Sequence, residues 1–182
     1  MYTEIAIEYL NKFITSYPDW PIPGVVFKDI NPVYANPVAK KFLLKAFGEL
    51  ISSYNFDGVV GIDARGFIMG SSIADYESLP FILARKAGKL PGQTHNASYS
   101  LEYGEAVIEM QHDLLLPLSG KNVIVYDDIL ATGGTAAAVG EILLKLDITP
   151  HFLFIGVVPG LGGVEKLQEK FKNSSIQCLV DL

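Results

Sequence analysis

The stretch Lys121–Thr135, KNVIVYDDILATGGT, decides the fold. Val123–Tyr126 is a short β-branched and aromatic run bounded by turn residues, which is typical of a strand buried on both faces of a parallel sheet. Two carboxylates, Asp127 and Asp128, come next, and a small-residue turn closes the stretch at Ala131–Thr135. A helix is predicted directly after this turn, because apolar residues recur there at helical spacing: Val139, Ile142, Leu143 and Leu146.

The turn is suited to hold a phosphate. Small hydroxyl and glycine residues at a helix start leave backbone N–H groups accessible, and the helix dipole adds partial positive charge there. The neighbouring carboxylates Asp127 and Asp128 repel each other and fit poorly beside a buried sheet, so we expect them to face solvent, a metal ion or a ligand rich in hydroxyl groups. Together the two features suit a sugar 5-phosphate. Without the strand and the turn, the two aspartates could equally be an acidic loop before a helix cap. The candidate phosphate residues are Ala131, Thr132, Gly133, Gly134 and Thr135.

The same residues carry a family resemblance. VIVYDDILATGGT resembles the 5-phosphoribosyl-1-pyrophosphate (PRPP) signature of the type I phosphoribosyltransferases. The resemblance implies PRPP as co-substrate and Mg²⁺ as cofactor, with Asp127 and Asp128 on the ribose hydroxyls and in indirect contact with the metal. Other nucleotide motifs fit less well: the chain has no G-x-x-x-x-G-K-[ST], and Gly160-Leu161-Gly162 is followed by Glu165 where a dinucleotide fingerprint has glycine.

Composition limits the class of protein. A chain of 182 residues with 49% hydrophobic and 19% charged residues is expected to form one globular domain. A net charge of −6 argues against nucleic-acid binding, and no apolar run reaches the roughly 20 residues of a membrane span. The start MYTEIAIEYL has no basic segment of the kind that begins a secretory signal, and Cys178 is the one cysteine, so we expect a cytoplasmic protein without an internal disulfide.

The only two arginines, Arg65 and Arg85, each follow a predicted strand, where open α/β sheets bind ligands. A guanidinium offers a rigid fork to phosphate oxygens, so both are candidates for anion recognition. GIDARGF resembles the family's pyrophosphate loop, which implies that Asp63, Ala64 and Arg65 contact the leaving diphosphate and that the Asp63–Ala64 peptide bond is cis. ARKAGKLPG resembles a second diphosphate loop, which implies the same role for Arg85, Lys86 and Lys89 and a homodimer contact nearby.

The string PIPGVVFKDINP resembles the N-terminal hood of the adenine-specific family members. The resemblance implies that Phe27 stacks on the base while Val26 and Lys28 present main-chain groups to its edge. Lys28 stands where related sequences often have arginine. The string VVPGLGGVEKL departs from the family at Val157 and Val158, where many adenine-specific members have an acid and a leucine; Val158 is still expected to form an apolar wall against the purine.

The string SYSLEYG resembles the family's mobile lid. It implies that Glu102 contacts adenine N7 and handles the proton there, and that Tyr103 packs over the diphosphate side and excludes water. Without the resemblance, a hairpin loop is the simpler interpretation. His95 and His112 lie nearby without further ligands at metal spacing, so both are expected to be surface histidines.

Strands and helices alternate along the chain, which predicts a parallel sheet with helices on both faces. We expect one domain over residues 1–182, with a hood at about 16–35 and a lid at about 95–110. The resemblance implies that the function is transfer of the phosphoribosyl group from PRPP to adenine. Two alternatives remain: transfer to hypoxanthine, xanthine or orotate, and a non-catalytic PRPP-sensing regulator. The expected helices are Thr3–Thr15, one beginning at Asn36-Pro37, Phe67–Glu77 and Val164–Phe171; the expected strands are Gly58–Ile62, Pro80–Ala84, Glu105–Met110, His151–Val157 and Ile176–Val180.

Overall fold

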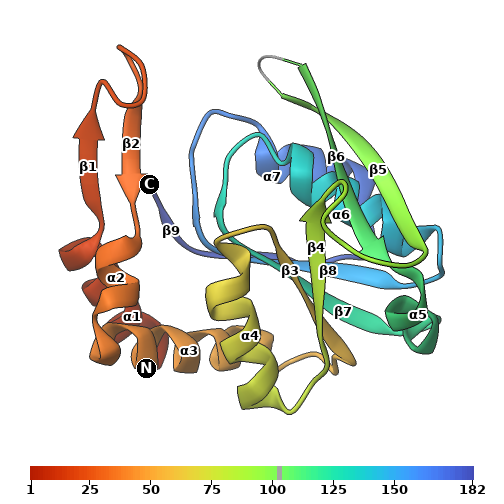
Figure 1. Cartoon of the computed structure of the whole chain (residues 1–182). Coiled ribbons are helices and arrows are strands. Elements are labelled where there is room, and N and C mark those ends of the chain that lie inside the picture. The colour runs from red at the N-terminus through yellow and green to blue at the C-terminus, as the bar shows by residue number, and fades with distance from the viewer. Residues whose placement is uncertain (102–103) are drawn as a thin grey trace. The chain divides into compact units, whose positions relative to one another are not determined.

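The computed structural model describes residues 1–101 and 104–182 (Figure 1). They form two compact units, one of residues 1–53 with Leu182 and one of residues 54–181. None of the described helices is both long enough and apolar enough to cross a membrane.

The first unit packs two helices against each other beside a small hairpin. The first helix buries Leu10 and the third buries Leu43 and Phe47, and these apolar faces meet. The third helix begins where the sequence predicted, because the Asn36 side chain accepts hydrogen bonds from the N–H groups of the first turn, each at 3.0 Å. The elements are α1 (Tyr2–Phe13), β1 (Thr15–Pro18), β2 (Val26–Asp29), α2 (Asn31–Ala35) and α3 (Pro37–Ile51).

Glu49 of α3 caps the start of α1. Its carboxylate accepts hydrogen bonds from the N–H groups of Tyr2 and Thr3 at 3.1 and 2.9 Å, and from the Thr3 hydroxyl at 2.9 Å. These bonds favour the ionised carboxylate and lower the pKa of Glu49 to about 2. The two helices are therefore joined by polar contacts as well as by their apolar faces.

The second unit is built on a seven-stranded sheet in the order β5-β6-β4-β3-β7-β8-β9. The five strands from β4 to β9 in this order run parallel, while β6 pairs antiparallel with both β4 and β5. The sheet is thus mostly parallel, as predicted, with an antiparallel hairpin at one edge. Its elements are β3 (Gly58–Ile62), α4 (Gly66–Glu77), β4 (Phe81–Lys86), β5 (Thr94–Leu101), β6 (Gly104–Gln111), α5 (His112–Leu115), the 3-10 turn η1 (Leu116–Leu118), β7 (Asn122–Leu130), α6 (Gly134–Leu144), β8 (Thr149–Val157), α7 (Gly163–Lys170) and β9 (Ile176–Asp181).

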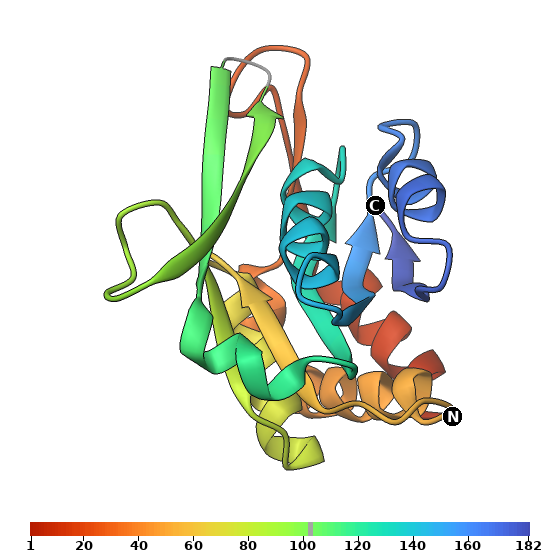
Figure 2. The same ribbon diagram turned by 90° about the vertical axis from the view of Figure 1, so that its right-hand side faces the viewer.

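Alternate residues of β7 face different helices, as expected for a strand buried on both faces. Val125 belongs to the core cluster that contains Val139 of α6. Its neighbour Tyr126 points to α4, where its ring lies 3.4 Å from the place that a Cβ at Gly70 would occupy. Helix α4 packs on β3, β4 and β7, whereas α6 packs against the β5–β6 hairpin and β8, so the sheet is covered on both faces (Figure 2).

Three differences from the sequence-based expectations concern residues of the predicted site and lid. Strand β7 continues to Leu130, because β8 still pairs with it at Ile129 and Leu130. Asp127 and Asp128 therefore lie within the strand, although they were expected after its end. Arg85 likewise lies inside β4, which extends to Lys86. Residues 94–101 form a strand of the edge hairpin, which the sequence reading had placed in a loop.

Candidate active site

The candidate site lies at the carboxyl ends of the parallel strands in the second unit. Strands β4, β3 and β7 are parallel neighbours, so their carboxyl ends lie on the same side of the sheet. Arg85 comes from the end of β4, the Asp63–Gly66 loop follows β3, and Asp127 and Asp128 come from the end of β7. The structure thus brings together both arginines and both aspartates that the sequence analysis singled out.

The predicted phosphate turn encloses a cavity of about 100 Å³, lined by Asp127, residues 129–136 and Phe154. Gly133 has a φ of 72°, a left-handed conformation that glycine adopts without steric cost, and α6 begins at the next residue. The first N–H groups of an α-helix have no acceptor inside the helix. The turn therefore presents backbone donors and the positive end of the helix dipole to the cavity, which is the arrangement that binds phosphate.

We call the turn at residues 131–135 and its cavity the phosphate cradle. A second turn, between β8 and α7, packs against the outside of this cradle. A Cβ at Gly163 would lie 2.2 Å from the Ala131 carbonyl oxygen, and a Cβ at Gly133 would lie 3.0 Å from the Gly163 carbonyl oxygen. The Val158 N–H also donates to the Leu130 carbonyl at 2.9 Å. Backbone therefore packs directly on backbone, and only glycine permits this approach.

The two aspartates differ in their surroundings. Asp128 is 1% exposed and its Oδ2 lies 2.8 Å from Arg65 Nε. The guanidinium is not aligned as a donor to this oxygen, so Oδ2 has no hydrogen-bond partner among the described residues. Asp127 is half-buried, and its Oδ1 accepts the Asp128 N–H at 2.9 Å. The expectation that both carboxylates avoid a buried position is wrong for Asp128, because Arg65 offsets the burial of its charge.

Burial also changes the protonation of the pair. Burial, together with the neighbouring charge of Asp128, raises the pKa of Asp127 to about 8. Burial raises the pKa of Asp128 as well, while Arg65 opposes that rise. At neutral pH the pair therefore carries less negative charge than its composition implies.

The two predicted diphosphate loops contact each other. Arg85 Nε lies 3.3 Å from Asp63 Oδ2, and Arg85 Nη1 donates to the Lys89 carbonyl at 3.3 Å. The side chains of Lys86 and Lys89 are exposed. The Asp63–Ala64 peptide bond is cis, as the resemblance implied. One arginine thus joins the loop after β3 to the loop after β4 and leaves two exposed lysines beside them.

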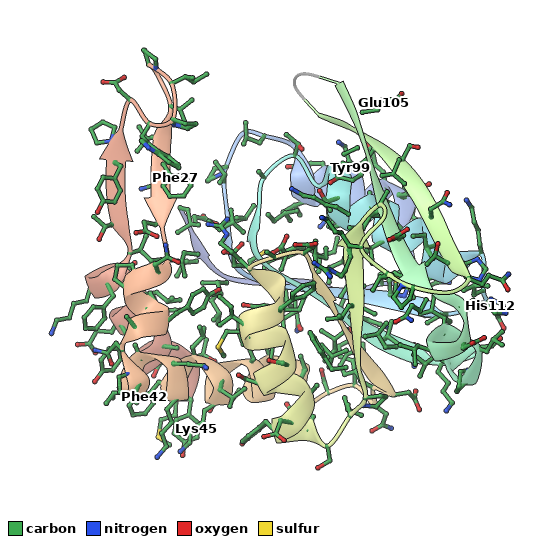
Figure 3. All side chains as sticks on the ribbon, viewed as in Figure 1. Phe27, Phe42, Lys45, Tyr99, Glu105 and His112 are labelled. Atoms are coloured by element: carbon green, nitrogen blue, oxygen red, sulfur yellow. The ribbon has the colours of Figure 1, made fainter. Side chains whose placement is uncertain are left out.

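The predicted base-binding residues are Val26, Phe27 and Lys28, and they lie on β2 in the first unit. Phe27 is half-buried, and Figure 3 shows it on the hairpin. The Trp20 ring meets it edge to face, with 4.4 Å between ring centroids. A cavity of about 300 Å³ opens beside these rings, lined also by Tyr17, Asp29 and Asn31. The hairpin therefore carries an accessible aromatic site for a flat ligand.

Comparison with known proteins gives the family. The family model "Phosphoribosyl transferase domain" matches residues 31–150. An adenine phosphoribosyltransferase of Bifidobacterium longum (strain DJO10A) is 41% identical over 172 residues, which cover 93% of this chain and 88% of the relative. The chain belongs to the adenine phosphoribosyltransferases.

Solved structures of adenine phosphoribosyltransferases are similar to this chain along its whole length. The Saccharomyces cerevisiae adenine phosphoribosyltransferase, in complex with adenine and an imino-altritol bisphosphate, matches with a TM-score of 0.88 and 34% identity over 97% of this chain and 99% of that one. The Giardia lamblia enzyme with 9-deazaadenine matches with a TM-score of 0.86 and 29% identity over 100% and 98%. The predicted type I phosphoribosyltransferase fold is therefore confirmed.

The remaining sequence-based assignments concern the lid residues, Val158 and two histidines. Glu102 and Tyr103 lie outside the described residues, so their roles stay predictions. Val158 directly follows β8 and is half-buried. His95 and His112 were expected to be surface histidines; both are half-buried, and a ring nitrogen of one lies 2.7 Å from a ring nitrogen of the other.

Three residues near the candidate sites were not predicted from the sequence. Trp20 contacts the predicted stacking residue, Gly163 supports the phosphate cradle, and Glu109 is a buried carboxylate on β6. The only sequence signal for Glu109 was an acid within the alternating strand pattern. No local signal marked Gly163, because its partner Ala131 is distant in the chain.

Within the described part of the chain, no group of three or more histidine, cysteine, aspartate or glutamate side chains is placed to hold a metal ion. Mg²⁺ usually keeps several waters and binds one or two carboxylates together with substrate phosphates. The two aspartates beside the phosphate cradle fit that mode, in which the substrate supplies most of the ligands.

Proposed function

We propose that this chain transfers the 5-phosphoribosyl group from PRPP to adenine, which gives AMP and diphosphate in purine salvage. One observation carries the proposal: an anion cradle and a pair of carboxylates lie at the same sheet edge, in a chain of the adenine phosphoribosyltransferase family. This pairing suits a ligand with a phosphate at one end and vicinal hydroxyls beside it.

The ribose is held at both ends. The N–H groups of residues 131–135 bind the 5-phosphate, and Asp127 and Asp128 accept hydrogen bonds from the ribose hydroxyls. Fixing both ends aligns C1 with the incoming base nitrogen, so that positioning accounts for much of the rate. As the bond between C1 and the diphosphate oxygen breaks, positive charge develops on the sugar, and the negative charge that remains on the aspartate pair stabilises it.

The leaving group departs toward the basic side of the site. The electron pair of the broken bond goes to diphosphate, whose charge is stabilised by Arg65, Arg85, Lys86 and Lys89 and by main-chain groups of the Asp63–Ala64 turn. Asp127 and Asp128 would hold Mg²⁺ indirectly together with PRPP, and the metal would supply positive charge for the departing diphosphate.

The base is held by the hood. Phe27 stacks on the adenine ring, Val26 and Lys28 present main-chain groups to its edge, and Val158 forms an apolar wall. The base nitrogen forms its new bond to C1 and the base releases one proton, for which Glu102, in contact with N7, is the proposed partner. Tyr103 closes over the site and keeps water from attacking C1. We further propose that the protein works as a homodimer in the cytoplasm.

A base-competition assay tests this function. The protein is incubated with PRPP, Mg²⁺ and equal concentrations of adenine, hypoxanthine, xanthine and orotate, and the nucleotides are separated. AMP should be the main product, formed together with an equal amount of diphosphate. A preference for a 6-oxopurine would contradict the adenine assignment, and ligand binding without any nucleotide formation would indicate a PRPP-sensing regulator.

A further inference from the structure

Glu109 is a buried carboxylate that the proposed mechanism does not use. It lies on β6 and is 8% exposed. Burying an ionised carboxylate without partners is costly, so its partners indicate why it is there. The buried polar residues among the described side chains are Glu109, Asp128 and His151, and of these Asp128 belongs to the site and His151 bonds to Ser175 at the amino end of the sheet.

A single oxygen of Glu109 holds the basic loop that follows β4. Its Oε1 accepts the N–H groups of Lys89 and Leu90, at 2.9 and 3.0 Å. Hydrogen bonds to a charged acceptor are about twice as strong as neutral ones. Glu109 is also the register partner of Arg85 in the pairing of β4 with β6, so the carboxylate lies where the loop leaves the sheet.

The rest of this loop has little packing to define its shape. Gly88 and Gly92 have φ values of 79° and 77°, and no atom lies within 4 Å of the position of a Cβ at either residue. Lys89 itself is exposed. The loop is therefore held mainly by hydrogen bonds, which include Ala87 N–H to the Val107 carbonyl and the Gln111 side chain to the Pro91 carbonyl.

The contacts continue from the loop to the other diphosphate segment. The Lys89 carbonyl, directly after the N–H that Glu109 fixes, accepts from Arg85 Nη1. The same guanidinium pairs with Asp63 through Nε. Displacement of Lys89 would therefore release one of the two contacts that orient Arg85.

We propose that Glu109 is a positioning residue for diphosphate recognition: by accepting two backbone N–H groups it fixes the Ala87–Gly92 loop and, through Lys89, the direction of Arg85. The inference rests on the proposed function, since it assigns diphosphate to this loop. Glu109 itself touches neither substrate. Its role requires an acceptor oxygen, which glutamine also provides, more than it requires a full negative charge.

The test compares Glu109→Ala, Glu109→Gln and the control Glu169→Ala, an exposed glutamate on α7. Steady-state kinetics give the KM values for PRPP and adenine and, in the reverse direction, for diphosphate. Loss of both hydrogen bonds in Glu109→Ala should raise the KM for PRPP and for diphosphate about tenfold and leave the KM for adenine within about twofold. Glu109→Gln should stay within about threefold of the wild type, and Glu169→Ala should not differ from it.

Amide hydrogen exchange reports the position of the loop directly. Exchange at Lys89 and Leu90 should accelerate in Glu109→Ala and remain slow in Glu109→Gln. An unchanged KM for diphosphate in a folded Glu109→Ala variant, an equal rise in the KM for adenine, or a Gln variant as impaired as the Ala variant would each overturn the inference.

Failure of the proposed function would appear separately, as absence of AMP with the wild type. Calorimetric titration with inorganic diphosphate alone then gives the same comparison, with about tenfold weaker binding expected for Glu109→Ala only. Equal diphosphate affinities of the three variants and the wild type would overturn the inference in that case too.

Discussion

Arg65 and Asp128 form an ion pair, with 2.8 Å between Nε and Oδ2. The pair joins the loop after β3 to the end of β7, so the cation proposed for diphosphate already contacts an acid proposed for the ribose. Asp128 is almost fully buried, whereas the Arg65 side chain is 40% exposed. The guanidinium can therefore reach a ligand while it neutralises the carboxylate.

This geometry predicts energetic coupling between the two residues. Arg65→Ala leaves a buried charge without its partner and should lower the free energy of unfolding by about 1–2 kcal/mol, less than for a fully buried pair because Arg65 is partly solvated. In an Asp128→Asn background, the same change should cost much less. Urea denaturation of the four proteins of this cycle measures the coupling. Equal effects of Arg65→Ala in both backgrounds would show that the pair contributes nothing.

The raised pKa of Asp127 predicts a dependence of stability on pH. Its carboxyl has a pKa of about 8 in the folded protein and about 3.8 when unfolded. Folding therefore favours the protonated form, and this contribution is lost as pH rises through about 8, with a slope of at most about 1.4 kcal/mol per pH unit. Asp127→Asn should be more stable than the wild type at pH 9, and the advantage should shrink toward pH 6.

Urea unfolding of both proteins without ligand and with a metal chelator measures this difference. Parallel stability curves for Asp127→Asn and the wild type between pH 6 and 9 would contradict the assignment of the raised pKa.

The glycine contact behind the cradle predicts a substrate-specific defect. A Cβ at position 163 would lie 2.2 Å from the Ala131 carbonyl oxygen, so Gly163→Ala must displace the phosphate turn. The KM for PRPP should rise at least about tenfold, with a stability loss of about 1–3 kcal/mol. Gly140→Ala is the matched control, because its Cβ would lie 2.5 Å from the Phe171 ring, away from the cradle. If both variants lose stability but neither changes the KM for PRPP, the turn does not position the phosphate.

The edge-to-face pair of Trp20 and Phe27 predicts an optical signal for base binding. Trp20 is the only tryptophan in the chain, so its emission comes from this one site. Trp20 is excited at a wavelength that adenine does not absorb. Adenine stacked on Phe27 should then change the Trp20 emission. Phe27→Ala should abolish the change and raise the KM for adenine about tenfold or more, with the KM for PRPP almost unaffected. An emission change that persists in Phe27→Ala would place the base elsewhere.

Local patterns were enough to predict much of the fold. Asn36-Pro37 gave the correct helix start because an N-cap and a proline at the first helical position act within one turn. Gly58–Ile62 was predicted without error because turn residues bound an apolar run. The turn at Ala131–Thr135 and the helix after it were also predicted from the local pattern, because small residues and glycines precede an apolar repeat at helical spacing.

The features that sequence could not predict depend on partners distant in the chain. The length of β7 follows from pairing with β8, and the burial of Asp128 is offset by Arg65. Glu109 looked like one more acid on an alternating strand until its contacts with the Lys89 loop were visible. None of these contacts can be predicted from the local sequence pattern, because each joins residues that are distant in the chain.

The most direct test of the account is a crystal structure with AMP bound. We expect the 5-phosphate against the backbone N–H groups of residues 131–135, the ribose hydroxyls at Asp127 and Asp128, and the adenine ring stacked on Phe27. A phosphate bound at any other place, with the cradle empty, would contradict the central claim.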